Sequence, residues 1–371
     1  MMVRHKNFIL LVLFLLVGLV LASCQTTGAI PRGWSGGTVA DGTLFVGSME
    51  GKLVAVNTQD GSRLWAEPLK VSEQTGGGLL GGCAPASTSV AIYGSPAVAG
   101  DLIFVGGYNG KIYATSASTR LSKDKYLNDR KREPIIGGPV VAGGTVYVGS
   151  ADGWVYALEM VSLNEQWKFE TGDKIWSTPV IEGDTLFIGS FDNKLYALNT
   201  TNGSKYWEFE TEGAIAATPL VYNNLVYVGS FDRYLYALGA ADGSFKWKFM
   251  AGNWFWSEPV VHDDIIYAAN LDGKVYALNA ENGEKIAEFD LGSPVSSSPV
   301  VAADSVIVAS EAGIVYKLDA RTNRQSQLLD LGEKVDAPLA ADGDKVYVHT
   351  GADALHEVDA QSGAVRKFNI K

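Results

Sequence analysis

The chain has 371 residues, a formal net charge of −11 at neutral pH and 47% hydrophobic residues. An acidic protein of this kind is a poor partner for nucleic acid or for anionic lipid, because both carry negative charge. Its two cysteines are too few for a disulfide framework.

Residues 1–23 have the pattern of a secretory signal peptide. Arg4 and Lys6 precede an apolar stretch that ends at Leu21, and small residues follow it. The stretch is shorter than the ~20 apolar residues that a membrane-spanning helix needs. Leu21-Ala-Ser-Cys24 resembles the bacterial lipobox, which implies that Cys24 is acylated and anchors the mature chain to a lipid bilayer. The alternatives are an uncleaved anchor and a plain signal peptide.

Residues 24–37 are predicted to be a tether between the lipid and the folded body. Gln25 follows the cysteine, whereas an aspartate there would resemble an inner-membrane retention signal. We therefore expect an exported, lipid-anchored protein at the periplasmic face of the outer membrane in a host with two membranes. In a host with one membrane, we expect it at the outer face of the cytoplasmic membrane. Acylation of Cys24 would leave Cys83 without a disulfide partner.

The rest of the chain repeats with a period of about 40 residues. Five prolines mark the period at positions 139, 179, 219, 259 and 299, and Pro338 follows. Such a period indicates one supersecondary unit that is copied many times. The clearest copy, residues 178–210, has four short apolar runs separated by Gly, Asn and Asp. These runs predict four strands joined by hairpins, which together make one blade of a β-propeller.

Eight copies can be counted from a residue of the second predicted strand. We therefore expect an all-β fold, an eight-bladed β-propeller of four-stranded antiparallel blades over residues 38–371. The first two copies are too far apart, which predicts a loop insertion at about 70–93. The counted positions are Gly47, Gly106, Gly149, Gly189, Gly229, Ala269, Ala309 and Val348.

Four tryptophans recur at one position of the repeat, and in three copies a glycine lies four residues earlier. The glycine would permit a turn, and the indole would then lie across the neighbouring blade. We interpret these tryptophans as blade-packing residues and not as ligand-stacking residues. They are Trp65, Trp167, Trp207 and Trp247.

The Tyr-Ala-Leu-Asx and Gly-x-x-x-Trp sequences resemble the pyrroloquinoline-quinone (PQQ) type of propeller repeat. Together with the lipobox, eight copies are similar to the BamB family, the accessory subunits of the outer-membrane β-barrel assembly machine. This resemblance implies a non-enzymatic, monomeric propeller that binds a protein partner within a complex. The partner would be an outer-membrane barrel-assembly protein if the host has an outer membrane.

Two other functions stay open at this point. The second branch of the same superfamily contains quinoprotein dehydrogenases, and resemblance to it would imply a PQQ-dependent alcohol or sugar dehydrogenase with bound calcium. A surface binder of glycans or small ligands is the third possibility, since aromatic rims suit sugar rings.

We find no catalytic residues in the sequence. The mature chain has three histidines at no metal-ligand spacing, and it has no Gly-x-Ser-x-Gly motif. Aspartates 152, 192, 232 and 272 share one phase of the repeat and could suggest calcium ligands. Their place in Ser-x-Asp turns favours capping of the backbone instead. We therefore expect no enzyme activity, no metal site and neither PQQ nor calcium as cofactor.

Aromatic residues in two sets of loops predict a docking face. In a four-stranded antiparallel blade, the turn after strand two and the link into the next blade emerge on the same side. Large apolar residues there would form a patch that requires a partner. The alternative is that they plug the mouth of the central channel. The candidate residues are Tyr108, Trp176, Phe191, Phe231, Arg233, Trp254, Phe255 and Trp256; Trp34 and Lys174 lie in the same loops.

Overall fold

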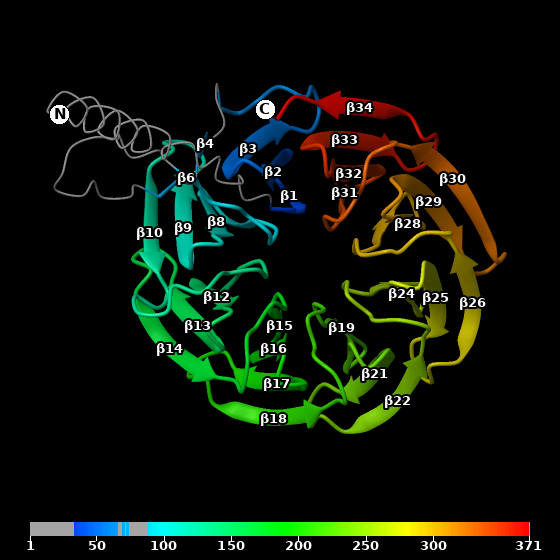
Figure 1. Cartoon of the computed structure of the whole chain (residues 1–371), viewed down its shortest axis with the longest axis horizontal. Helices are drawn as coiled ribbons and strands as arrows, with labels where there is room; N and C mark the ends of the chain where they lie inside the picture. Colours follow the sequence, from blue (N-terminus) through cyan, green and yellow to red (C-terminus); the bar gives the residue numbers. More distant parts are fainter. Residues whose placement is uncertain (1–32, 66–68, 71, 74–87, 371) are drawn as a thin grey trace, which may run out of the picture. The chain divides into compact units, whose positions relative to one another are not determined.

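Eight four-stranded sheets follow one another around a ring in the computed structural model (Figure 1). The structure describes residues 33–65, 69–70, 72–73 and 88–370. The predicted signal peptide, Cys24, most of the tether and most of the insertion with Cys83 lie outside these residues. No helix in the described ranges is long and apolar enough to cross a membrane. The expected all-β, eight-bladed propeller is confirmed.

Each blade is antiparallel, and its strands run in chain order from the channel to the rim (Figure 1). Blade 1 contains β1 (Gly37–Ala40), β2 (Thr43–Gly47), β3 (Lys52–Asn57) and β4 (Leu69–Lys70). Blade 2 contains β7 (Ala97–Ala99), β8 (Leu102–Gly106), β9 (Lys111–Ser116) and β10 (Ser122–Tyr126). Blade 3 contains β11 (Val140–Ala142), β12 (Thr145–Gly149), β13 (Trp154–Glu159) and β14 (Glu165–Glu170). Blade 4 contains β15 (Val180–Glu182), β16 (Thr185–Gly189), β17 (Lys194–Asn199) and β18 (Lys205–Glu210).

The second half of the ring has the same order. Blade 5 contains β19 (Leu220–Tyr222), β20 (Leu225–Gly229), β21 (Tyr234–Gly239) and β22 (Phe245–Met250). Blade 6 contains β23 (Val260–His262), β24 (Ile265–Ala269), β25 (Lys274–Asn279) and β26 (Lys285–Asp290). Blade 7 contains β27 (Val300–Ala302), β28 (Ser305–Ala309), β29 (Ile314–Asp319) and β30 (Arg324–Asp330). Blade 8 contains β31 (Ala340–Asp342), β32 (Lys345–Thr350), β33 (Ala354–Asp359) and β34 (Val365–Phe368). A separate pair, β5 (Ser72–Glu73) and β6 (Thr88–Ser89), lies between blades 1 and 2 in sequence.

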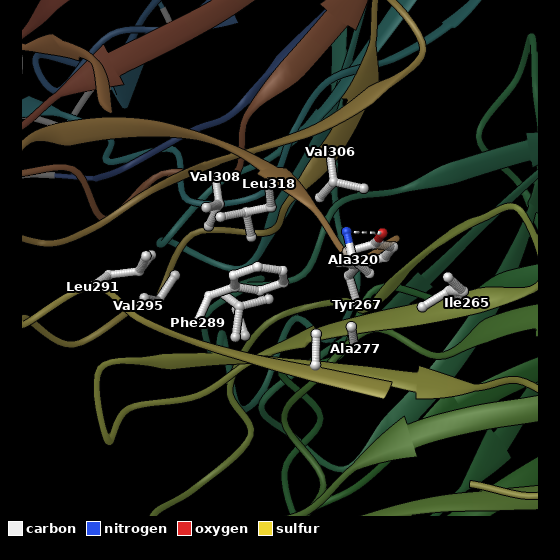
Figure 2. Close-up of a cluster of buried hydrophobic side chains, with 13 residues drawn as sticks. Ile265, Tyr267, Ala277, Phe289, Leu291, Val295, Val306, Val308, Leu318 and Ala320 are labelled. Carbon is white, nitrogen blue, oxygen red and sulfur yellow. Dashed lines mark hydrogen bonds between the residues drawn. The ribbon is translucent and has the colours of Figure 1, made fainter. Parts of the chain in front are cut away.

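The hydrophobic core lies between the blades. The second and third strands of a blade are buried along nearly their whole length, because a neighbouring blade covers each face. Figure 2 shows the layer between blades 6 and 7, where Tyr267 and Phe289 pack against Leu318. The Tyr267 hydroxyl also accepts the backbone N–H of Ala320 at 3.4 Å. Such layers explain why these strands are apolar at consecutive positions and do not alternate.

The four recurrent tryptophans join each blade to the next one. Each is at most 9% exposed and lies 5.7–6.2 Å, centroid to centroid, from an aromatic ring of its own blade's second strand. Each indole N–H donates to a carbonyl of the following blade, as Trp247 does to Ala280 at 3.2 Å. The other three pairs are Trp65 with Ala117, Trp167 with Thr200 and Trp207 with Ala240.

The recurrent glycine of strand two makes room for the link into the next blade. A Cβ on Gly149 would overlap Ile175, and a Cβ on Gly229 would overlap Phe255. In blade 6 the strand-two residue is Ala269, and the smaller Val295 belongs to the same core cluster. The sizes of the two residues therefore compensate each other around the ring.

The ring closes by contacts between blades 8 and 1, without exchange of a strand. His349 pairs with Leu355 as Gly189 pairs with Leu195, so His349, and not Val348 as expected from the sequence, is the strand-two residue of blade 8. In the other junctions the strand carries a glycine or an alanine and the link a larger residue, as with Gly149 and Ile175. At this junction the strand carries the large residue, His349, and the link carries Gly33. The His349 ring contacts the Ser35 carbonyl through Nδ1 at 2.9 Å and an Asp353 carboxylate oxygen through Nε2 at 3.0 Å.

Two predicted boundaries need correction. Residues 33–36, expected in the 24–37 tether, belong to the propeller, since Ser35 is fully buried and its hydroxyl donates to the Gly94 carbonyl at 3.0 Å. The predicted 70–93 insertion ends earlier than expected. Val90 and Ile92 are buried between blades 1 and 2, because Ile92 takes the place that Ile135 takes in the next link.

Candidate binding face and central cavity

The eight links that enter the blades line the centre of the ring. In the links into blades 4 to 8, residues two apart line the channel, and the residue between them does not, as Ser177 lies between Trp176 and Thr178. The intervening residue is small and buried, as Ser177 and Ser297 are. We call the first residue of each such pair the upper channel position and the second residue the lower channel position. The upper position holds Trp34, Tyr93, Ile136, Trp176, Ala216, Trp256, Ser296 and Asp336. The lower position holds Gly36, Ser95, Gly138, Thr178, Thr218, Glu258, Ser298 and Pro338.

Five of the predicted docking residues form one continuous aromatic cluster across blades 4 to 6. The Phe231 ring stacks on Trp254 at 4.5 Å and on Trp256 at 5.6 Å, with interplanar angles of 11° and 12°. Trp176 contacts Phe191 edge-on at 4.6 Å. It also contacts Trp256 at 6.1 Å. The structure therefore joins side chains from three blades into one apolar surface at the mouth of the channel.

One member of this cluster is exposed, and cations lie beside it. The Trp254 side chain is 44% exposed although it is a large apolar group. The Lys174 ammonium lies 4.5 Å from the centre of the Phe191 ring and 5.2 Å from that of Trp176. Arg233 is exposed in the turn that carries Phe231. Tryptophan and arginine are enriched in protein-binding surfaces, and this cluster exposes one of each, Trp254 and Arg233.

Tyr108 belongs to a second, smaller cluster on blades 1 and 2. Its ring lies 5.4 Å from Tyr93, which contacts Trp34 edge-on at 4.6 Å. Sequence reasoning missed Tyr93 because it was assigned to the insertion. The signal that could have found it is the alignment of Ile92-Tyr-Gly-Ser-Pro96 with Ile135-Ile-Gly-Gly-Pro139.

Phe255 does not belong to the docking face, so this prediction is corrected. Its side chain is 1% exposed and packs in the core with Tyr227 and Leu235. The reason is its place in the link, where Ile175 and Ile215 are buried against the strand-two glycine of the preceding blade. Phe255 is the large member of that buried series, while its neighbours Trp254 and Trp256 point outward.

A cavity of about 490 Å³ occupies the centre of the ring, and residues of all eight blades line it. Trp34, Trp176 and Trp256 form part of its wall. Its two carboxylates, Glu258 and Asp336, differ in their surroundings. The Lys334 ammonium pairs with Asp336 at 2.9 Å, whereas no hydrogen bond or ion pair from any described residue reaches the Glu258 carboxylate.

Burial raises the pKa of Glu258 well above its ordinary range, to about 7. The folded protein thus keeps the proton up to about pH 7, whereas the unfolded chain releases it near pH 4.3. The free energy of unfolding contributed by Glu258 therefore falls as the pH rises between these values, and the penalty persists above pH 7. This residue is the single ionisable side chain at the lower channel position.

We expect Glu258→Gln to stabilise the protein at pH 8 by up to about 3 kcal/mol and to have little effect at pH 4.5. The amide keeps the shape of the side chain and removes the buried charge. Urea unfolding of both proteins at the two pH values measures the difference. Glu281→Gln, at an exposed turn of the same blade, should change nothing at either pH. An equal effect of Glu258→Gln at both pH values would contradict the assignment.

The in-phase aspartates hold turns together. The Asp232 carboxylate accepts the Tyr236 hydroxyl at 2.6 Å, and the backbone N–H groups of Tyr234 and Glu212 at 2.9 and 3.0 Å. Burial first, and then the bond to the carboxylate, raise the pKa of Tyr236. The same hydroxyl bond joins Tyr156 to Asp152, Tyr196 to Asp192 and Tyr276 to Asp272. In the described ranges, no group of three His, Cys, Asp or Glu side chains could hold a metal ion.

The cavity does not fit the quinone cofactor of the dehydrogenase branch. PQQ carries three carboxylates, which need basic partners in a protein interior. The described residues that line the cavity include no lysine and no arginine, and Glu258 would repel an anion. No step of a quinone reaction follows from these residues.

Comparison with solved structures shows the same fold in other proteins. BamB from Moraxella catarrhalis is 18% identical, with a TM-score of 0.72; the match covers 87% of this chain and 95% of that one. The computationally designed Ika8 protein is 13% identical, with a TM-score of 0.70, over 93% and 98% of the two chains. The chain has no match among the curated proteins. The family model described as outer membrane protein assembly factor BamB matches residues 71–176 and 164–366. These residues are well over half of the sequence, and the chain therefore belongs to this BamB family.

Proposed function

We propose that this protein is a lipid-anchored, non-enzymatic scaffold that docks a protein partner in outer-membrane β-barrel assembly. Membership of the BamB family supports a scaffold role. The lipobox-like Leu21-Ala-Ser-Cys24 supports an anchor in the bilayer, with the propeller on the periplasmic side of the outer membrane. The partner is a barrel-assembly protein of that membrane, and the propeller acts as one copy within the complex.

The observation that carries this proposal is the aromatic cluster of blades 4 to 6. Its members come from different blades yet contact one another continuously, and Trp254 leaves 44% of its surface in solvent. Stacking on Phe231 holds the exposed indole in one orientation, so little conformational entropy is lost when a partner covers it. Large, rigid aromatic groups of this kind supply most of the binding energy in protein interfaces.

We further propose that the protein binds neither PQQ nor calcium. The acidic, aromatic lining of the cavity supports this, because an anionic quinone would find no basic partner in it. A titration with PQQ and calcium should therefore leave the absorption spectrum of the quinone unchanged. A bound chromophore with dye-linked oxidation of an alcohol would reverse this assignment.

The docking face is tested by Trp254→Ala. We expect capture of the host's barrel-assembly protein by the immobilised full chain to weaken by about 30-fold or more, the effect of losing one interface hot spot. The melting temperature should stay within about 2 °C of the wild-type value, because the indole is half exposed. Phe245→Ala is the matched control, since Phe245 is 52% exposed but lies on β22 at the rim.

Retained capture by Trp254→Ala would remove this face from the proposal. Loss of capture by Phe245→Ala instead would place the partner on the rim of the ring. If the wild-type chain captures no barrel-assembly protein from solubilised envelopes, the proposed role itself is wrong.

A further inference from the structure

One acidic side chain in the centre of the ring has no hydrogen-bond or ion-pair partner in the part of the chain that the structure describes. Glu258 lines the cavity from the lower channel position of blade 6, and its backbone N–H, not its carboxylate, is bonded, to the Ser298 hydroxyl at 3.2 Å. The other seven residues at this position are uncharged. Nothing in the repeat explains a carboxylate here, because the fold uses Thr178 and Thr218 at the equivalent places.

The second carboxylate of the cavity already has a cationic partner. Asp336 pairs with Lys334 at 2.9 Å, and Lys334 also pairs with Glu311 at 3.1 Å. The described lining residues include no cation that could serve Glu258 in the same way. Among the described residues, Glu258 is therefore the cavity carboxylate that has no ion-pair partner.

Aromatic rings surround the route to this carboxylate. Trp34, Tyr93, Trp176 and Trp256 occupy four of the eight upper channel positions, and all four line the cavity. The faces of indole and phenol rings attract cations, most strongly where water is displaced. An aromatic rim above a single carboxylate is the arrangement that recognises an organic cation, because the rings bind its apolar surface and the carboxylate binds its charge.

We infer that the central cavity binds a small organic cation with an ammonium group, held by Glu258 and enclosed by the aromatic residues of the upper channel position. The cavity volume of about 490 Å³ lies within the range of ligand sites and suits a group of this size. The ammonium group can belong to a free metabolite or to a lysine side chain of a bound protein. This inference does not depend on the partner proposed above.

Binding should strengthen as the pH rises through about 7. Burial raises the pKa of Glu258 to this value, so at lower pH the carboxyl group is protonated and cannot pair with a cation. The other ionisable groups of the cavity wall are Asp336, which stays paired with Lys334, and the phenols Tyr93 and Tyr108. Burial also raises the pKa of Tyr93, which therefore stays neutral over this range.

The test uses the purified full chain with choline and cadaverine as probes, by calorimetry and tryptophan fluorescence at pH 8. We expect both cations to bind at least about tenfold more tightly than their neutral isosteres, 3,3-dimethyl-1-butanol and 1,5-pentanediol, since a charge-assisted contact is worth about this factor. Glu258→Gln should remove this preference and leave binding of the neutral compounds unchanged. Glu281→Gln, in the same blade, should bind as the wild type does.

Further measurements identify whether the bound ammonium group belongs to a free amine or to a lysine side chain, and they exclude misfolding of the variant. N-acetyl-lysine methylamide bound more tightly than choline assigns the site to a lysine side chain, and the reverse order assigns it to a free quaternary amine. Retained partner capture by Glu258→Gln shows that the variant is folded and that docking does not need this carboxylate, although Trp176 and Trp256 belong to both surfaces. Failure of both cations to bind, or equal binding of cations and neutral isosteres, overturns the inference, as does an unchanged cation affinity in Glu258→Gln.

Discussion

Trp247→Ala is expected to lower the free energy of unfolding by about 3–5 kcal/mol, the range for truncating a buried tryptophan. Trp247 is 7% exposed, contacts Tyr227 at a centroid distance of 5.7 Å and donates its indole N–H to the Ala280 carbonyl. The substitution leaves a cavity between blades 5 and 6 and removes the indole hydrogen bond across the blades, and both effects destabilise the fold. The Ala280 carbonyl keeps its second hydrogen bond, from the Tyr227 hydroxyl at 2.9 Å. Urea unfolding followed by tryptophan fluorescence measures the loss.

Phe245→Ala is the control for this experiment. Phe245 is a large aromatic residue of the same strand, β22, but 52% of its surface is exposed. Its removal should change the free energy of unfolding by less than about 1 kcal/mol. Similar losses in the two variants would show that the outer strand is stabilised by general apolar cover and not by the indole contact across the blades.

The contact of Trp247 with the next blade also explains the Gly-x-x-x-Trp spacing of the repeat. The sequence suggests that a glycine and a tryptophan four residues later act together. In the structure, Gly243 lies against Trp207 of the preceding blade, and Gly283 lies against Trp247. Each motif thus contains halves of two different contacts, since a Cβ at either glycine would overlap the indole of the blade before.

The contact between successive blades accounts for two of the irregular copies, those of blades 3 and 6. Blade 6 has Gly283 without a tryptophan at Ala287, because the glycine serves Trp247. Blade 3 has Trp167 but Leu163 in place of the glycine. In the preceding blade the residue opposite Ala114 is Lys123, whereas in blade 3 the residue opposite Ala157 is Trp167, so blade 2 has no indole for a glycine to accommodate. Contacts between successive copies could not be predicted from one copy alone.

The architecture was predictable because its signals are local and repeated. Proline, turn glycine and apolar strands recur at a fixed spacing, so eight blades follow from counting. The aromatic cluster was predictable for Trp176, Phe191, Phe231, Trp254 and Trp256, because turn and link residues emerge on one side of any such blade, whereas its role in docking stays a prediction. The prediction was wrong for Phe255, because neighbouring residues of a link differ in whether they face the channel or the core.

The cavity chemistry was not predictable, because it depends on the whole ring. Glu258 is one acid among many in the sequence. Only the convergence of eight links at the centre shows that its neighbours are uncharged and that Lys334 pairs with Asp336 and not with Glu258. Ring closure was equally hidden, since His349 and Ser35 lie at opposite ends of the chain.

His349→Ala should open this closure and lower the free energy of unfolding by about 3–5 kcal/mol, the effect of removing one partner of a buried polar pair. The His349 ring is 2% exposed, and each of its nitrogens faces an oxygen acceptor, one on Ser35 and one on Asp353. Asp353 also accepts the backbone N–H of Met49 at 3.0 Å, so one cluster joins blade 8 to two segments of blade 1. Alanine would leave the Ser35 carbonyl and the Asp353 carboxylate buried without the ring.

The local nature of this contact gives the experiment a second measurement. Amide hydrogen exchange over residues 35–49 should accelerate in His349→Ala more than exchange in blade 5, because the first blade loses its attachment before the rest of the ring unfolds. His262→Ala, a histidine whose side chain is 17% exposed on β23, should leave both quantities nearly unchanged. A loss below about 1 kcal/mol with uniform exchange would mean that apolar contacts close the ring by themselves.

The apolar contacts of the closure include Phe368 against Tyr347, with Gly61 of blade 1 beneath the Phe368 ring. Phe368 and Gly61 thus repeat, at the closure, the aromatic-on-glycine contact of Trp247 and Gly283, so the polar cluster of His349 is the feature that distinguishes this junction from the others.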